Sequence, residues 1–372
     1  MNAPERDPLG GARRARVVST VRGDVRALGR YAVAQADGWI KLDAMEDPYG
    51  LPAELAVAVG KAVERAAVNR YPDGDAHGVK AALREAFALS DDLAILVGNG
   101  SDELIQIITA AVVRAGDVVL APDPSFVMYR RNALMMQARF CAVPLRDDFS
   151  LDADAMLAAI ARERPALVWI AYPNNPTGNL FHAEAVARIA AAAPGLVIVD
   201  EAYYAYADDS FLPRMRDFAN LVVVRTVSKI GMAGLRLGYA VGHPDWIAEF
   251  DKLRPPYNVN ALTQAALPVL LAHRDVFARH AALIRAERER LASLLGALEG
   301  VHVHPSQTNF VVARVSDANA WFDALCAAKI LVKNLHGWHP VLANCLRITV
   351  GTPAENDALV DVLRDCAQGG AR

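Results

Sequence analysis

The sequence is poor in cysteine and has no long apolar run. Only four of its 372 residues are cysteine, and they lack the paired spacing of a zinc site or of a disulfide framework. We therefore expect reduced thiols in a cytoplasmic protein, and no metal site. No uninterrupted stretch of about 18 apolar residues is present, so we expect no membrane span. The polar N-terminus is unlike a secretory signal.

A strong net charge is also lacking. The formal charge of −3 offers no broad attraction for nucleic acid or an anionic membrane, so we expect neither as a partner. Hydrophobic residues make up 53% of the chain and charged residues 22%, which is ordinary for a globular protein. The length permits two or three domains and a large core.

Short apolar runs alternate with alanine-rich helical segments through the first two thirds of the chain. The runs that we expect to be strands cover residues 93–97, 117–121, 166–171, 196–199 and 221–224. Strand, helix and strand at this spacing predict a mostly parallel sheet flanked by helices. After Arg236 the pattern changes. A long amphipathic helix over 274–298 precedes expected strands at 310–315, 330–332 and 345–350 and helices that include 318–329.

The sequence therefore predicts an α/β fold with a large domain and a smaller α+β domain. We place the large domain at residues 46–255 and the small C-terminal domain at 256–372. Residues 1–45 are expected to form an N-terminal arm that packs on the small domain.

Polar groups follow several of the expected strands at their carboxyl ends, which is where ligands lie in parallel sheets. Lys229 follows the run at 221–224, and an amine at the mouth of a buried strand can act as a nucleophile toward a carbonyl. A lysine at a strand end with no such groups around it would be interpreted as an ordinary surface residue. Three further polar side chains fall at the same edge: Asn175, Asp200 and Tyr203.

A phosphate seat is expected beside this lysine. The glycines of residues 98–100 precede a helix, so the backbone N–H groups of Ser101 and Asp102 could meet a phosphate at the positive end of the helix dipole. Taken by itself, this stretch predicts only an ordinary turn. Positive charge would come from Arg236, and hydroxyls from Thr226 and Ser228.

Together these groups fit pyridoxal 5′-phosphate. Lys229 would bind its aldehyde covalently, and Asp200 would hold the proton on its pyridine nitrogen. Asn175 and Tyr203 would hydrogen-bond its phenolic oxygen. Phe126, on a proline-stiffened loop, would stack on its ring, although core packing is about equally compatible with the sequence.

Three motifs resemble those of a known family: 175–178 (Asn-Pro-Thr-Gly), 200–203 (Asp-Glu-Ala-Tyr) and 228–229 (Ser-Lys). They resemble the aspartate-aminotransferase-like superfamily of pyridoxal-phosphate enzymes. Nearly everything after residue 20 is similar, more narrowly, to the histidinol-phosphate aminotransferases. The resemblance implies a homodimer in which Tyr71 reaches the partner's cofactor phosphate. It also implies that Tyr31, Asn175, Lys333 and Arg347 face the substrate.

The implied reaction is transamination of L-histidinol phosphate with 2-oxoglutarate, which gives imidazole-acetol phosphate and glutamate in histidine biosynthesis. The catalytic residues would be Lys229, Asp200 and Tyr203, with Lys229 moving the Cα proton. The sequence departs from the family at two positions. Asp47 stands where the family usually has asparagine. Lys333 stands where it often has arginine, which forks around a phosphate whereas lysine is a point charge.

Other functions fit parts of the pattern. An aromatic-amino-acid aminotransferase or a threonine-phosphate decarboxylase would use the same fold. A cofactor-sensing transcription regulator would need a basic DNA-binding module, for which the 20 to 30 residues before the body leave no room. A catalytically inactive scaffold is disfavoured because every expected cofactor-binding group is present.

Overall fold

The computed structural model describes residues 10–30, 34 and 36–369. The chain divides into two compact units, residues 1–37 and 38–372. In the first unit the described helices are α1 (Gly10–Thr20) and α2 (Gly23–Ala27). Every other element named below belongs to the second unit. Among the helices of the described residues, none combines the length and the apolar composition that crossing a bilayer requires.

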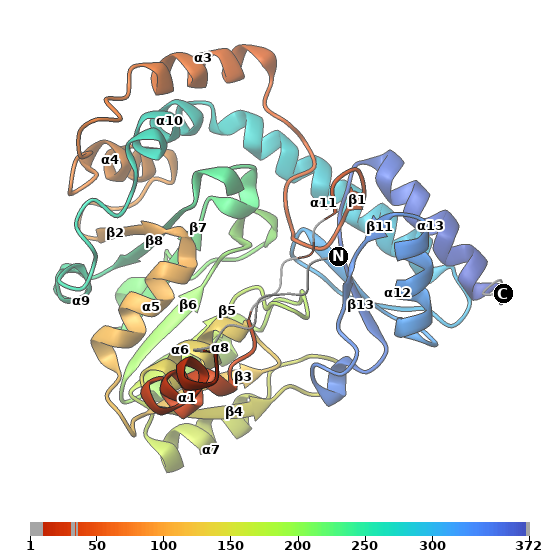
Figure 1. The fold of residues 1–372 in the computed structure, drawn as a ribbon, viewed down its shortest axis with the longest axis horizontal. Coiled ribbons are helices and arrows are strands. Elements are labelled where there is room, and N and C mark those ends of the chain that lie inside the picture. The colour runs from red at the N-terminus through yellow and green to blue at the C-terminus, as the bar shows by residue number, and fades with distance from the viewer. Residues whose placement is uncertain (1–9, 31–33, 35, 370–372) are drawn as a thin grey trace. The chain divides into compact units, whose positions relative to one another are not determined.

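A seven-stranded sheet forms the centre of the second unit (Figure 1). Its strands run in the order β2 (Ala94–Asn99), β8 (Leu237–Gly242), β7 (Leu221–Thr226), β6 (Leu196–Asp200), β5 (Leu167–Ala171), β3 (Val118–Asp123) and β4 (Arg139–Pro144). Only β8 runs antiparallel to its neighbours, and the other pairs are parallel. The predicted mostly parallel sheet is therefore confirmed.

Helices cover both faces of this sheet. Side chains alternate between two apolar clusters, so that Val222 and Val224 lie in one and Leu221 and Val223 in the other. The first cluster includes side chains of α5 (Gly100–Val112), α6 (Val127–Met135) and α9 (Pro244–Asp251). The second includes side chains of α3 (Ala53–Glu64), α4 (His77–Ala86), α7 (Ala153–Glu163), α8 (Ala183–Ala192) and α10 (Ala261–Ala272). Burial on two faces explains why these strands are continuous apolar runs.

A smaller, antiparallel sheet follows in the C-terminal part, where the sequence predicted a smaller α+β unit; of the three strands expected there, 310–315 and 345–350 belong to this sheet and 330–332 does not. Its order is β12 (Lys333–Asn334), β13 (Cys345–Thr349), β10 (Phe310–Arg314) and β9 (His302–His304). Its cluster includes side chains of α11 (Arg274–Gly296), α12 (Ala318–Ala327) and α13 (Pro353–Ala367). A separate parallel pair joins β1 (Ile40–Lys41) to β11 (Ile330–Leu331).

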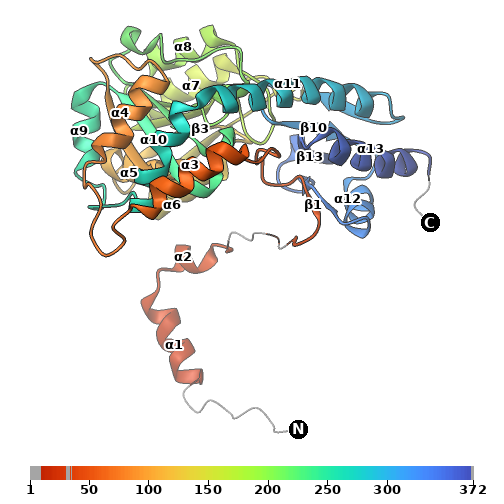
Figure 2. The same ribbon diagram turned by 90° about the horizontal axis from the view of Figure 1, so that it is seen from above.

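Helix α11 joins the two parts of the second unit (Figure 2). Near its start, Val276 and Phe277 pack in the cluster of the large sheet. Farther along, Ala281, Ile284 and Leu291 pack in the cluster of the small sheet. The domain boundaries given above, at residues 45 and 255, stay predictions.

Strand β8 is absent from the strands that the sequence predicted. Glycine ordinarily weakens a strand and often marks a close approach of backbone. A Cβ atom on Gly238 would lie 2.5 Å from the carbonyl carbon of Gly100 and 2.5 Å from the Ser101 nitrogen. The glycine is therefore what lets β8 pass directly against the start of α5.

Candidate active site

The predicted site residues gather at the carboxyl ends of the parallel strands. Asp200 ends β6, Asn175 lies four residues beyond β5, and Lys229 lies in a short 3₁₀ helix, η3 (Ser228–Ile230), that follows β7. The strands are in register there, because Asp200 pairs with Ala171 on one side and with Val224 on the other. The sheet thus brings together groups that are far apart in the sequence.

Lys229 presents an amine that is easily deprotonated. Loss of hydration, and after it the positive charge of Arg347, lowers its pKa to about 8. Its Nζ atom donates to the carbonyl oxygen of Ala44 at 3.1 Å. Its own carbonyl oxygen accepts the Tyr206 hydroxyl at 2.6 Å, which fixes the turn. At neutral pH this lysine has a far larger neutral fraction than an exposed one, as a nucleophile requires.

Asp200 is buried, and both its carboxylate oxygens accept hydrogen bonds. Oδ2 accepts the Tyr129 hydroxyl at 2.7 Å, and Oδ1 accepts the Ala202 N–H at 3.1 Å. Burial raises its pKa to about 6, and these two bonds act in the opposite direction. Asp200 is therefore mostly ionised at neutral pH.

The sequence analysis missed Tyr129. It is fully buried in α6 and stacks on Trp169 with the ring centroids 4.8 Å apart. The available signal was its place three residues after Phe126, the residue that precedes α6 and meets the Tyr129 ring edge to face.

The corner predicted to bind an anion lies where α5 begins. Its first N–H groups have no intrahelical partner, and a Cβ atom on Gly100 would lie 3.0 Å from Nη2 of Arg236. The charges of Arg236 and Lys229 both act on Asp102, whose pKa is nevertheless raised by partial desolvation. Glu103 points back from the helix start, since its carboxylate accepts the Asn99 N–H at 2.7 Å.

Two predicted hydroxyls lie beside this corner. Thr226 Oγ1 is 2.9 Å from Ser228 Oγ, and it donates to the Leu237 carbonyl oxygen at 3.0 Å. Arg236 thus lies against the start of α5, and Thr226 is joined to it through Leu237, which bridges to Gly100. A phosphate seat at this position stays a prediction.

Arg347 forms the opposite side of the site. Its Nη1 donates to Asn175 Oδ1 at 2.7 Å, and its Nη2 donates to the Asp43 carbonyl oxygen at 3.1 Å. Lys333 pairs with it across β12 and β13. Burial, and after it the charge of Arg347, lowers the pKa of Lys333. Its ammonium lies 5.1 Å from the centroid of the Trp338 ring. The two cations therefore lie on neighbouring strands, facing one region.

The remaining predicted residues differ in their surroundings. Phe126 is half-buried and meets Tyr129 edge to face, with the centroids 5.7 Å apart. Tyr203 is buried and meets Phe310 edge to face at 5.4 Å. Tyr71 is 81% exposed and stacks on Tyr257 with the centroids 4.5 Å apart. Tyr31 lies outside the described residues. The roles assigned to all of these side chains stay predictions.

A buried ion pair, also missed from the sequence, lies next to two of the predicted site residues. Arg225 donates to Glu201 through Nε at 2.9 Å and through Nη2 at 2.7 Å. Each residue is next to a predicted site residue, Thr226 and Asp200 respectively, so the pair ties the ends of β7 and β6 together. Arg225 also lies over the Tyr204 ring, 4.1 Å from its centroid.

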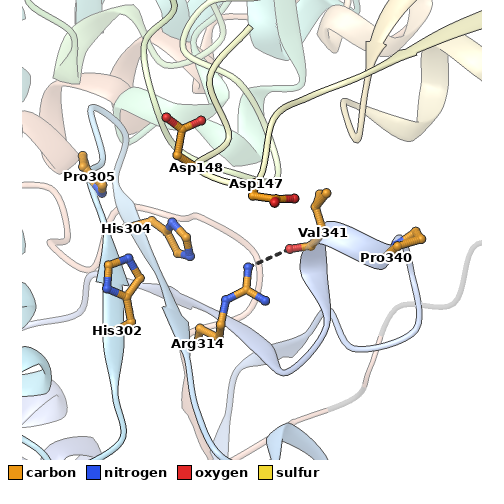
Figure 3. Close-up of a pocket in the computed structure, with 8 residues that line it drawn as sticks. All are labelled: Asp147, Asp148, His302, His304, Pro305, Arg314, Pro340 and Val341. Atoms are coloured by element: carbon orange, nitrogen blue, oxygen red, sulfur yellow. Dashed lines mark hydrogen bonds between the residues drawn. The ribbon is translucent and has the colours of Figure 1, made fainter. Parts of the chain in front are cut away.

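A pocket away from this site contains none of the predicted residues (Figure 3). It lies between the loop after β4 and the small sheet, and its lining is Asp147, Asp148, His302, His304, Pro305, Arg314, Pro340 and Val341. Burial lowers the pKa of His304 to about 4, so this imidazole is neutral at physiological pH. Arg314 is engaged by the Val341 carbonyl oxygen at 2.8 Å.

Known proteins resemble the chain over nearly its whole length. A histidinol-phosphate aminotransferase from Chromobacterium violaceum is 53% identical over 348 residues, which are 94% of this chain and 98% of that protein. Histidinol-phosphate aminotransferase 1 from Ralstonia nicotianae is 51% identical over 92% of each. Among solved structures, histidinol-phosphate aminotransferase from Sinorhizobium meliloti, in complex with pyridoxal-5′-phosphate, is 28% identical. It has a TM-score of 0.84 and covers 94% of this chain and 98% of that one.

The family described as aminotransferase class I and II matches residues 37–363. That range contains both sheets and every predicted site residue except Tyr31. The chain therefore belongs to the aminotransferase class I and II family.

Proposed function

We propose that the protein catalyses the pyridoxal-phosphate-dependent transamination of L-histidinol phosphate with 2-oxoglutarate, giving imidazole-acetol phosphate and glutamate in histidine biosynthesis. Two relatives of the same printed name, each at least 51% identical, support this substrate. One observation carries the proposal: the backbone of residues 43–44 contacts both Lys229, the proposed nucleophile, and Arg347, the proposed anion-binding group. Ala44 O accepts from Lys229, and Asp43 O accepts from Arg347.

The donor set of the site fits pyridoxal 5′-phosphate. Arg236 and the start of α5 would hold the phosphate, Lys229 the aldehyde carbon and Asp200 the pyridine nitrogen. A glycine at 100 leaves room for Arg236, since a Cβ atom there would lie 3.0 Å from its guanidinium. Asn175 and Tyr203 would bind the phenolic oxygen, and Phe126 would cover the ring. When bound, this cofactor supplies an electron sink that stabilises negative charge at the substrate Cα.

The chain's own residues then bind substrate and move protons. Arg347, with Lys333 beside it, attracts the substrate phosphate, and in the second half-reaction it attracts a carboxylate of 2-oxoglutarate. Lys229 takes the proton from the substrate Cα as a general base and gives it back as an acid. Its pKa of about 8 suits both tasks near neutral pH. Asp200 keeps a negative charge in the buried site.

We further propose that the protein is a cytoplasmic homodimer. Its four cysteines are unpaired, which supports a reducing compartment. Besides Tyr71, several other large apolar side chains are exposed, and exposed apolar surface of this kind often marks interfaces. They include Val57, Val68, Tyr257 and Leu262.

A direct assay tests the substrate. The purified protein, loaded with pyridoxal phosphate, is given L-histidinol phosphate and 2-oxoglutarate, and glutamate is measured. Phenylalanine and threonine phosphate are offered in parallel, and carbon dioxide is measured with the latter. Glutamate formed fastest from histidinol phosphate supports the proposal. A higher kcat/KM with phenylalanine, or carbon dioxide from threonine phosphate, would reject it in favour of an aromatic aminotransferase or a decarboxylase.

Arg347 and Lys333 give a prediction about the substrate phosphate. A charge-assisted bond contributes about 1.5–3 kcal/mol, so Arg347→Ala should raise the KM for histidinol phosphate roughly ten- to a hundredfold. It should also raise the KM for 2-oxoglutarate and leave the cofactor bound. Lys333→Ala should lower kcat/KM for histidinol phosphate more than kcat/KM for unphosphorylated histidinol. The measurement is the ratio of kcat/KM for the two amines, and an unchanged ratio in both variants would show that neither residue reads the phosphate.

Tyr71 gives a prediction about the dimer. Mixed dimers of Tyr71→Phe and Lys229→Ala subunits should hold one intact site of two, provided that Tyr71 serves the partner's cofactor. Equal mixing should restore about a quarter of the parent activity, because half of the dimers are hybrids. Tyr257→Phe replaces Tyr71→Phe in the control mixture. Activity no higher than the mean of the two parent variants would rule out a shared site.

A further inference from the structure

Asp47 and His280 form a buried pair at one end of the segment of residues 43–47. Asp47 Oδ2 is 3.1 Å from His280 Nδ1, and the two side chains are 3% and 12% exposed. Because a carboxylate only accepts hydrogen bonds, Nδ1 carries the proton. Asp47 Oδ1 accepts the Tyr49 N–H at 2.9 Å. Both oxygens are thus engaged, and the segment is fastened to α11.

The same carboxylate lies against the turn that carries Lys229. A Cβ atom on Gly231 would come within 2.8 Å of Asp47 Oδ2 and 3.0 Å of Phe277 Cδ1. Gly231 has a φ of +89°, so glycine is required there on conformational grounds as well. Asp47 therefore contacts α11 and the turn just after the nucleophile.

At its other end the segment contacts the reactive groups themselves. Lys229 donates to Ala44 and Arg347 donates to Asp43 at this end. The backbone of Met45 makes two further hydrogen bonds. Its N–H donates to Thr349 Oγ1 at 3.0 Å, and its carbonyl oxygen accepts Asn309 Nδ2 at 2.9 Å. The backbone of residues 43–45 is thus a bridge between the amine and the guanidinium.

We infer that Asp47 and His280 are positioning residues for the reaction. Their bond fixes the segment of residues 43–47 on α11, and so sets where the carbonyl groups of Asp43 and Ala44 hold Arg347 and Lys229. The inference rests on the proposed function for its kinetic consequence only, because the fastening itself is a property of the folded chain.

The conservative variant separates positioning from charge. In Asp47→Asn the amide oxygen still accepts the Tyr49 N–H. The amide NH₂ can donate to Nδ1 of the other neutral imidazole tautomer of His280. Both contacts survive without the negative charge. Asp47→Ala loses both contacts, and His280→Ala loses only the bond to α11.

Hydrogen–deuterium exchange of the peptide covering residues 42–49 measures the fastening without substrate. In Asp47→Ala and in His280→Ala, exchange should accelerate roughly tenfold and kcat/KM for the amino donor should fall about tenfold, as expected for the loss of one buried hydrogen bond. Asp47→Asn should match the parent in both readouts. The double alanine variant should be no worse than Asp47→Ala, because the residues act as one unit. Asp275→Ala, which breaks an exposed 2.6 Å ion pair with Arg279 on the same helix, is the control and should change neither readout.

The outcomes are distinct. Parent-like exchange in both alanine variants overturns the inference, and so does faster exchange with kcat/KM equal to that of Asp275→Ala. Additive losses in the double variant also overturn it, because they indicate two independent roles. A parent protein with no transaminase activity, but with the expected exchange pattern, would reject the proposed function and leave the fastening of the segment established.

Discussion

Replacing Lys229 with alanine is expected to abolish turnover while the protein stays folded. The amine is the base and acid of the proposed proton transfer, so its loss should lower kcat by roughly 10⁴-fold. The visible absorption of lysine-bound cofactor should vanish as well. Lys333 also has a lowered pKa near Arg347, but it lies on β12 against the Trp338 ring and not at the end of β7, so we do not expect it to replace Lys229.

Two further variants complete this experiment. Lys229→Arg keeps a positive charge but cannot deprotonate, and it should be as inactive as the alanine variant. Lys252→Ala removes an exposed lysine paired with Glu249 and should keep both absorption and turnover. A Lys229→Ala protein that retained the band and turned over normally would falsify the assignment of the nucleophile.

Asp200→Asn should bind the cofactor and yet lose about two to four orders of magnitude in kcat. Without the carboxylate, the pyridine nitrogen loses its proton and the electron sink is weakened. The structure adds a second reason. Both carboxylate oxygens accept hydrogen bonds, from Tyr129 and from the Ala202 N–H, whereas an amide has only one oxygen. In the variant one of these two buried donors faces an NH₂ group.

Tyr129→Phe is the matched control for Asp200→Asn. It removes one hydrogen bond to the carboxylate and leaves the charge, so the pKa of Asp200 should rise above about 6 because the Tyr129 bond lowers it. Activity should then be lost at a higher pH as the solution is acidified, while kcat on the alkaline side stays close to that of the parent.

For Asp200→Asn, the measurement is the single-turnover rate of proton removal from the substrate Cα. Near-normal rates in Asp200→Asn would reject the proposed role.

Local patterns predicted much of the fold and the strand-end groups. The run at 221–224 and the polar residues after it were enough to place Lys229 at the mouth of a buried strand. The strand expected at 345–350 is present as β13, in which Arg347 and Thr349 both contact residues 43–45 and therefore share one face.

Long-range partners could not be predicted in this way. The guanidinium of Arg347 contacts the amide of Asn175 and the carbonyl oxygen of Asp43. These residues lie 172 and 304 positions away, and no local periodicity encodes such distances. Tyr129 was missed for the same reason, since its partner Asp200 is 71 positions away. Strand β8 was missed because Gly238 is needed for the close approach of β8 to the start of α5, and a glycine does not by itself indicate a strand.

The antiparallel pairing of β2 with β8 has a consequence for how the chain is made. Ala94 pairs with Gly242 and Asn99 with Leu237, so β2 leaves the ribosome roughly 140 residues before the strand that flanks it. At about 5–20 residues per second this delay is on the order of ten seconds. Throughout it, the nascent chain carries an apolar strand whose backbone groups have no partner, which is the condition under which strands associate with other chains. We expect the interval between residues 99 and 237 to be when newly made protein most needs a chaperone.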